Sequence, residues 1–150
     1  MKKKTKFKKK KKNLKQNRTV EFAQKSDKDM PMCVPTHMIL LRYESKHGII
    51  WHRDNDPNDG YNDNPIVTFS FGNSCTFCYL DGREKVPVSL GSGDVVLFGG
   101  PSRMVDHCVS EIQLGTSPSF LKLENEIRYV FAFRNSPNMF GHEKDFQFNY

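Results

Sequence analysis

From residue 37 onward the chain is a succession of short β-rich runs separated by turn residues, and this pattern limits the possible folds more than any other feature. The breaks include Gly72-Asn73-Ser74, Asp81-Gly82 and Gly99-Gly100-Pro101, which suit hairpin turns and tight connections. Regularly spaced short strands without intervening helices predict an all-β sandwich or barrel rather than a parallel α/β sheet. Eight strands are expected: His37–Tyr43, Gly48–His52, Ile66–Phe71, Cys75–Leu80, Lys85–Leu90, Asp94–Phe98, Met104–Val109 and Ile127–Phe133.

Charge divides the 150 residues into two parts. Residues 1–30 hold 13 Lys or Arg against three acidic residues, whereas residues 31–150 hold 10 basic and 14 acidic residues. Like-charge repulsion and a shortage of apolar side chains predict a disordered, Lys-rich tail over 1–30 and one folded domain over 31–150. The tail is either a plain solvated segment or an arm for nuclear targeting or nucleic-acid tethering. Because no run of about 18 apolar residues occurs, no membrane span is predicted. The basic start lacks the apolar stretch of a secretory signal, so we expect an intracellular protein of the nucleus or cytoplasm.

Four cysteines allow two disulfides or one zinc site in principle. Cys75 and Cys78 have CxxC spacing, but they lie in a predicted strand, where residues three apart point to opposite faces. No second CxxC completes a set of four ligands. Ordinary reduced thiols are therefore the favoured interpretation.

His52-Arg53-Asp54 is the first motif that suggests chemistry. In an extended chain, residues two apart project from one face, so His52 and Asp54 can converge on one cation. The alternative is an exposed histidine beside an Asp paired with Arg53. His107 follows a strand and a Gly-Gly-Pro turn, so a third ligand can return to the same end of a barrel. Two His and one carboxylate form the set used by non-haem Fe(II) oxygenases, with zinc as the main rival.

Arg128-Tyr-Val-Phe-Ala-Phe-Arg134 is the second such motif. An even spacing places both guanidinium groups on one face of a strand and Tyr129, Phe131 and Phe133 on the other. The two Arg Cα atoms are then about 20 Å apart, so long side chains leaning together can hold the two ends of a dicarboxylate. The alternative is a pair of surface charges on an amphipathic edge strand.

Taken together, these motifs resemble the AlkB-like Fe(II)- and 2-oxoglutarate-dependent dioxygenases, which repair or edit N-alkylated nucleobases. The resemblance covers roughly residues 38–135, with the motifs in the family's order. The matching segments are Arg42-Tyr43, His52 to Asp56, Pro65 to Gly72, Gly93 to Arg103, His107 and Arg128 to Arg134.

The resemblance implies a double-stranded β-helix, or jelly roll, and assigns roles to single residues. It implies Fe(II) as cofactor, and 2-oxoglutarate and dioxygen as cosubstrates. The implied metal ligands, which are also the catalytic residues, are His52, Asp54 and His107. The implied 2-oxoglutarate residues are Arg128 with Tyr43 at the distal carboxylate and Arg134 nearer the metal. The implied substrate-binding residues are Asp56 and Arg103, with support of the site rather than substrate contact as the alternative for Arg103. Trp51 is a further candidate from the sequence itself: strand alternation places it toward the core, and stacking on a base is the alternative.

The implied reaction is oxidative demethylation of alkylated DNA or RNA, presented as a single strand or a flipped base. Two other functions stay open: an oxygenase acting on a protein or small molecule, and a truncated, non-catalytic jelly roll tethered to nucleic acid by its Lys-rich tail. Two departures from the family bear on this choice. Leu41 stands where nucleic-acid-active relatives often place an Asn that contacts the cosubstrate. In relatives, a lid that binds the target base precedes this point of the chain. The Lys-rich segment that precedes it here is not expected to form such a lid.

Overall fold

The computed structural model describes residues 19–25, 27–54, 63–123 and 127–135. Within them the structure has eight strands, as predicted, and all of their pairings are antiparallel. Seven of the expected strands agree with the observed bounds to within two residues at each end. The strands are β1 (His37–Tyr43), β2 (Ile49–His52), β3 (Ile66–Gly72), β4 (Ser74–Asp81), β5 (Glu84–Leu90), β6 (Val95–Phe98), β7 (His107–Gln113) and β8 (Arg128–Arg134).

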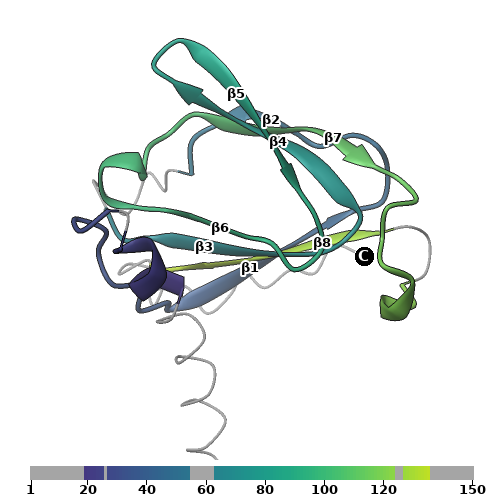
Figure 1. Cartoon of the computed structure of the whole chain (residues 1–150), viewed down its shortest axis with the longest axis horizontal. Helices are drawn as coiled ribbons and strands as arrows, with labels where there is room; N and C mark the ends of the chain where they lie inside the picture. Colours follow the sequence, from purple (N-terminus) through teal and green to yellow (C-terminus); the bar gives the residue numbers. More distant parts are fainter. Residues whose placement is uncertain (1–18, 26, 55–62, 124–126, 136–150) are drawn as a thin grey trace, which may run out of the picture.

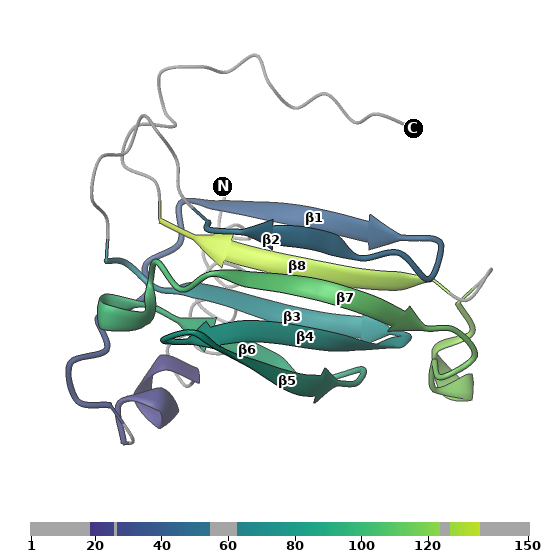
Figure 2. The ribbon, with the colours of Figure 1, turned by 90° about the horizontal axis from the view of Figure 1, so that it is seen from above.

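The strands form two four-stranded sheets that face one another, with orders β1-β8-β3-β6 and β2-β7-β4-β5 (Figures 1 and 2). The chain crosses from one sheet to the other at every connection except the β4–β5 hairpin. That hairpin turns at Gly82, whose φ of +60° is readily adopted by glycine. This arrangement is the predicted jelly roll.

The seventh strand differs most from its predicted bounds, Met104–Val109. A short 3-10 turn, η1 (Gly100–Ser102), follows β6, and Arg103 after it keeps helical backbone angles. The strand begins only at His107 and then continues to Gln113. Met104, the predicted first residue of the strand, still belongs to this turn, and β7 therefore begins later, at His107.

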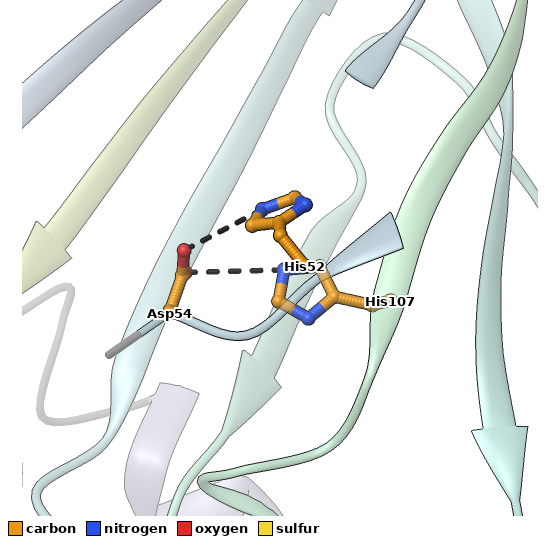
Figure 3. Close-up of side chains that lie close together, drawn as sticks. All are labelled: His52, Asp54 and His107. Carbon is orange, nitrogen blue, oxygen red and sulfur yellow. Dashed lines mark ion pairs between the residues drawn. The ribbon is translucent and has the colours of Figure 1, made fainter. Parts of the chain in front are cut away.

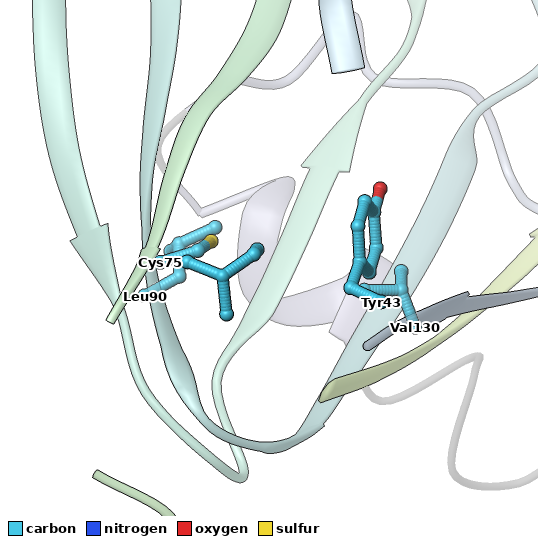
Figure 4. Close-up of a cluster of buried hydrophobic side chains, with 5 residues drawn as sticks. Tyr43, Cys75, Leu90 and Val130 are labelled. Atoms are coloured by element: carbon cyan, nitrogen blue, oxygen red, sulfur yellow. The ribbon is translucent and has the colours of Figure 1, made fainter. Parts of the chain in front are cut away.

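Apolar side chains between the sheets form the core. Its largest described cluster joins Tyr43 of β1, Val130 of β8, Cys75 of β4, Leu90 of β5 and Ile112 of β7 (Figure 4). Leu41, at the position of the family's Asn, packs against this cluster. Both sheets therefore contribute to one interior.

Packing begins earlier in the chain than the predicted boundary at residue 31. Residues 19–23 are helical, and the helix lies on the outer side of the β1-β8-β3-β6 sheet (Figure 1). Val20 and Met30 are buried in a cluster with Cys33 and with Val67 of β3. The prediction of disorder through residue 30 is thus wrong for residues 19–25 and 27–30. Although charged residues are common in this part of the chain, its few apolar side chains pack against the outer face of the sheet. Residues 1–18 lie outside the described residues.

No helix among the described residues has the length and hydropathy needed to cross a membrane. The four cysteines are all buried and free of disulfides, in agreement with the interpretation as reduced thiols.

Candidate metal centre and cosubstrate site

Strand pairing brings together the three predicted metal ligands, two of which lie 55 residues apart in the sequence. His52, the last residue of β2, is the cross-strand partner of His107, the first residue of β7. Asp54 follows two residues after His52. Its carboxylate oxygens lie 3.6 Å from Nε2 of His52 and 4.0 Å from Nε2 of His107 (Figure 3). One donor atom from each residue lies within 4.8 Å of the other two, which is close enough for all three to reach one cation.

Backbone contacts fix the ring orientation of both histidines. Nδ1 of His52 lies 2.8 Å from the carbonyl oxygen of Ile50, and Nδ1 of His107 lies 2.9 Å from that of Val105. Because a carbonyl only accepts hydrogen bonds, each Nδ1 must carry the proton, which leaves each Nε2 with a free lone pair toward Asp54. Such outer partners are typical of metal-binding histidines, and the donor set therefore fits a divalent metal.

Aromatic rings surround His107 on the inner side. Its ring centroid lies 5.0 Å from that of Phe98, 5.6 Å from that of Phe77 and 4.4 Å from that of His52. Burial among these rings lowers the pKa of His107, and the hydrogen bond to Val105 only partly opposes this effect. A neutral imidazole is the form that binds a metal.

The two arginines of β8 share one face of the strand, as predicted from their even spacing, and that face is turned toward the space between the sheets. Arg128, Val130 and Ala132 alternate as buried residues along the strand. On the opposite face, Phe131 and Phe133 make edge contacts with Phe71 and Phe69. Arg134 ends β8 at the end of the sandwich where β7 begins with a metal ligand, and Arg128 starts β8 at the other end (Figure 2).

Both arginines carry a buried donor that lacks a partner. Among the described residues, the only buried side-chain nitrogen or oxygen atoms without a hydrogen bond are Nε of Arg128 and Nε of Arg134. Buried polar groups are rarely left unpaired, and a carboxylate is the natural acceptor for a guanidinium. The residues therefore fit a dicarboxylate with one end toward each arginine.

The rest of the Arg128 guanidinium is held by the protein. One terminal nitrogen donates to the carbonyl oxygens of Asn73 (2.7 Å) and Leu90 (3.4 Å), and the other donates to Oγ of Ser70 (2.7 Å). Sequence analysis missed these partners, since a serine inside a strand carries no signal of its role. They fix the guanidinium plane and leave Nε as the donor available for a ligand.

Tyr43 lies directly opposite Arg128 in the pairing of β1 with β8. Burial raises the pKa of its hydroxyl to about 12, although the Arg128 cation acts in the opposite direction. The phenol thus stays protonated and can donate a hydrogen bond to a carboxylate. This placement is compatible with the predicted role of Tyr43 as a helper of Arg128.

Arg103 contacts backbone on both sides of segment 55–62. Its Nε donates to the carbonyl oxygen of Asn64 (3.1 Å), and a terminal nitrogen donates to that of Asp54. The side chain is buried. Arg103 therefore fastens the metal ligand Asp54 to the returning chain, and its predicted contact with substrate stays a prediction.

The remaining substrate residues have mixed outcomes. Trp51 is 42% exposed, so the expectation that it faces the core is wrong. The reason is local: β2 has four residues, pairs only with β7, and shifts register between Ile49 and His52, which breaks simple alternation. Asp56 lies outside the described residues.

A jelly roll with two histidines and one carboxylate at one end, and two arginines whose Nε atoms are buried in the same interior, has the architecture of a non-haem Fe(II) oxygenase. The chain belongs to the 2OG-Fe(II) oxygenase superfamily, whose family model matches residues 2–134. Membership implies Fe(II) as cofactor and 2-oxoglutarate and dioxygen as cosubstrates.

Several relatives are AlkB-like members. The chain is 36% identical over 109 residues to the DNA N(6)-methyladenine demethylase ALKBH1C of Arabidopsis thaliana, covering 69% of this chain and 24% of that protein. It is 30% identical over 105 residues to the alpha-ketoglutarate-dependent dioxygenase AlkB of Salmonella typhimurium, covering 68% and 46% respectively. The solved structure of OsALKBH1 superposes with a TM-score of 0.69 at 28% identity, covering 82% of this chain and 60% of that one. The chain thus spans about a quarter of the plant relative and about half of the bacterial one.

Proposed function

We propose that this chain is an Fe(II)- and 2-oxoglutarate-dependent dioxygenase that demethylates N-alkylated nucleobases in DNA or RNA. The observation that supports the dioxygenase activity is that a candidate metal site and a candidate 2-oxoglutarate site lie in the same interior. The three metal-donor residues meet at one end, and the only unpaired buried donors of the described side chains belong to the two arginines expected to hold 2-oxoglutarate. The nucleobase substrate is supported by similarity to relatives named as demethylases of DNA N(6)-methyladenine.

In this proposal each site residue has a separate task. His52, Asp54 and His107 hold Fe(II), which together with 2-oxoglutarate and dioxygen supplies the oxidising power to hydroxylate an N-methyl carbon, so that the group leaves as formaldehyde. Arg128 and Tyr43 bind the distal carboxylate, and Arg134 supports the end nearer the metal. The protein's own contribution is to orient the cosubstrate and to keep the interior apolar around it.

The nucleic acid is proposed to reach the metal as a single strand or as a flipped base, because a base inside a duplex cannot approach a buried metal. The exposed indole of Trp51 lies next to a metal ligand in the sequence and is suited to stack on a base. Asp56 is proposed to contact the exocyclic amine of the target base. The Lys-rich segment, with ten Lys within the first 15 residues, would attract phosphates without reading sequence. We place this activity inside the cell, in the nucleus or cytoplasm.

The test is a turnover assay with methylated oligonucleotides. Single- and double-stranded oligonucleotides carrying 1-methyladenine, 3-methylcytosine or N(6)-methyladenine are incubated with Fe(II), 2-oxoglutarate and air, and succinate and formaldehyde are both measured. Equal amounts of the two products, absent under anaerobic conditions and in His52→Ala, support the proposal. Succinate without formaldehyde from any oligonucleotide would contradict the nucleobase substrate and favour a protein or small molecule. Absence of both products would favour a non-catalytic jelly roll.

A further inference from the structure

A two-pronged ion pair joins the two chain segments that carry the metal ligands. Nε of Arg53 donates to Oδ1 of Asp106 (2.9 Å), and a terminal nitrogen of Arg53 donates to Oδ2 (2.6 Å). Arg53 lies between the ligands His52 and Asp54, and Asp106 directly precedes the ligand His107. The pair therefore links all three metal ligands through their immediate neighbours.

This link acts where the sheet provides little other support. β2 has four residues, lies at the edge of its sheet and pairs with β7 irregularly between Ile49 and His52. Asp106, by contrast, is anchored to a third strand, because its carbonyl oxygen accepts a hydrogen bond from the amide of Leu80 (3.0 Å). Asp106 is thus held in place by β4, and through the ion pair it holds Arg53 and the end of β2, which has few other contacts within the sheet.

We propose that Arg53 and Asp106 are positioning residues that set the distance between the β2 and β7 arms of the metal centre. The proposal concerns metal binding by the superfamily site and does not depend on the nucleobase substrate. The two side chains are 54% and 33% exposed, so they contribute little to global stability. Their effect is expected in the arrangement of the metal ligands.

If the ion pair acted on the metal only through its charges, removal of Arg53 would change the metal affinity in the opposite direction from a positioning role. Removing the cation of Arg53 beside a divalent metal would strengthen metal binding by Coulomb's law, whereas removing the Asp106 anion would weaken it. A positioning role predicts that both removals weaken binding. The sign of the effect at Arg53 therefore separates the two explanations.

The experiment measures binding of Mn(II) and Co(II) alone, by calorimetry and by the ligand-field absorption of Co(II), to the full chain and to Arg53→Gln, Asp106→Asn and the double variant. We expect roughly 10-fold weaker binding in each single variant, at the lower end of the 10–100-fold loss typical for outer partners of metal ligands. The double variant should bind about as weakly as the single ones, because both remove the same link. The Co(II) spectrum should change in all three, while melting temperatures stay close to that of the parent.

Two further variants complete the design. Arg53→Lys keeps the charge but cannot form the parallel pair of hydrogen bonds, so it should also lose affinity. Arg42→Gln is the matched control, since Arg42 forms an exposed 2.6 Å ion pair with Glu44 away from the metal ligands, and its metal affinity should not change. Metal binding by Arg53→Gln at or above parental affinity would overturn the proposal, as would additive losses in the double variant or full affinity in Arg53→Lys.

Discussion

Tyr43 of β1 and Arg128 of β8 are direct cross-strand partners at the end of the sandwich opposite the start of β7. The buried Nε of Arg128 has no partner among the described residues, and the neighbouring phenol stays protonated because burial raises its pKa to about 12. Two donors of different strength therefore lie side by side, one charged and one neutral. Their separate removal should affect 2-oxoglutarate binding to different extents.

We predict that Arg128→Lys raises the KM for 2-oxoglutarate by about 10- to 100-fold, the equivalent of the roughly 1.5–3 kcal/mol of a hydrogen bond to a charged group. Lysine keeps the charge but loses the planar fork. Tyr43→Phe removes one neutral donor and should raise KM by only about 2- to 10-fold. Succinate formation at varied 2-oxoglutarate measures both. An unchanged KM in Arg128→Lys would count against the predicted role of this arginine.

Removal of a metal ligand should abolish metal binding without unfolding the protein. His52→Ala and Asp54→Ala each delete one of three donors at partly exposed positions, so the loss of Mn(II) affinity should exceed the 10–100-fold typical of outer partners. His47→Ala is a suitable control, because His47 is exposed and contacts Ser45 away from the centre. Calorimetry with the metal alone checks this. Parental affinity in Asp54→Ala would show that the three residues do not form the site.

Sequence alone predicted the parts of the fold that depend on local periodicity. The alternation along β8 predicted that Arg128 and Phe131 lie on opposite faces, because a strand paired on both sides keeps its period of two. Which of the two faces is inward became clear only from the packing of the sheets. The same rule failed for Trp51, since the register of β2 shifts between Ile49 and His52. The register shift arises from the pairing with β7, and the residues of β2 alone do not predict it.

The candidate site shows the same division. His52, Asp54 and His107 were found from their spacing and family resemblance, because metal ligands must be of a few residue types. The partner of Arg53 was not found: the sequence alternative paired it with the adjacent Asp, whereas in the structure it reaches Asp106 across the strands. Any Asp is equally plausible as a partner until the pairing of β2 with β7 sets which one lies within reach.

Gly72 is predicted to tolerate no side chain. A Cβ at this position would lie 2.0 Å from the carbonyl oxygen of Ile127, and its φ of +89° is unfavourable for other residues. Gly72→Ala should therefore lower the free energy of unfolding by about 3 kcal/mol or more, the upper end of overpacking effects. Gly82→Ala provides the comparison, because Gly82 also has positive φ (+60°) but open space around it, and it should cost only about 1–2 kcal/mol. Urea unfolding of both variants measures the difference, and equal losses would contradict the steric argument.

The helical residues 19–23 should contribute to stability through Val20. This side chain is fully buried against β3, and its truncation in Val20→Ala removes two methyl-sized groups, each worth about 0.8 kcal/mol. We expect a loss of about 1–2 kcal/mol in urea unfolding. Glu21→Ala, one residue later and exposed, is the control and should change stability little. Identical stabilities of Val20→Ala and the parent would restore the sequence prediction that the folded domain begins at residue 31.

The stability of the domain should decline in alkaline solution because of Cys33. Its thiol is buried and donates to the carbonyl oxygen of Pro65 (3.5 Å), and burial raises its pKa from 9.0 to about 11. Between these two values the unfolded chain releases the proton while the folded chain keeps it, so the unfolded state binds fewer protons and the free energy of unfolding falls as pH rises. The contribution is about 2–3 kcal/mol across this window, and it is fully present below pH 9.

Urea unfolding of the parent and Cys33→Ala at pH 8, 9, 10 and 11 measures this effect. Alanine removes the titrating group, so the variant should start lower at pH 8, because it loses a buried contact, but its stability should fall less steeply above pH 9. Other groups, including Tyr43 with its pKa near 12, titrate in both proteins and cancel in the comparison. Parallel curves for the two proteins would show that the thiol ionises equally in the folded and unfolded states.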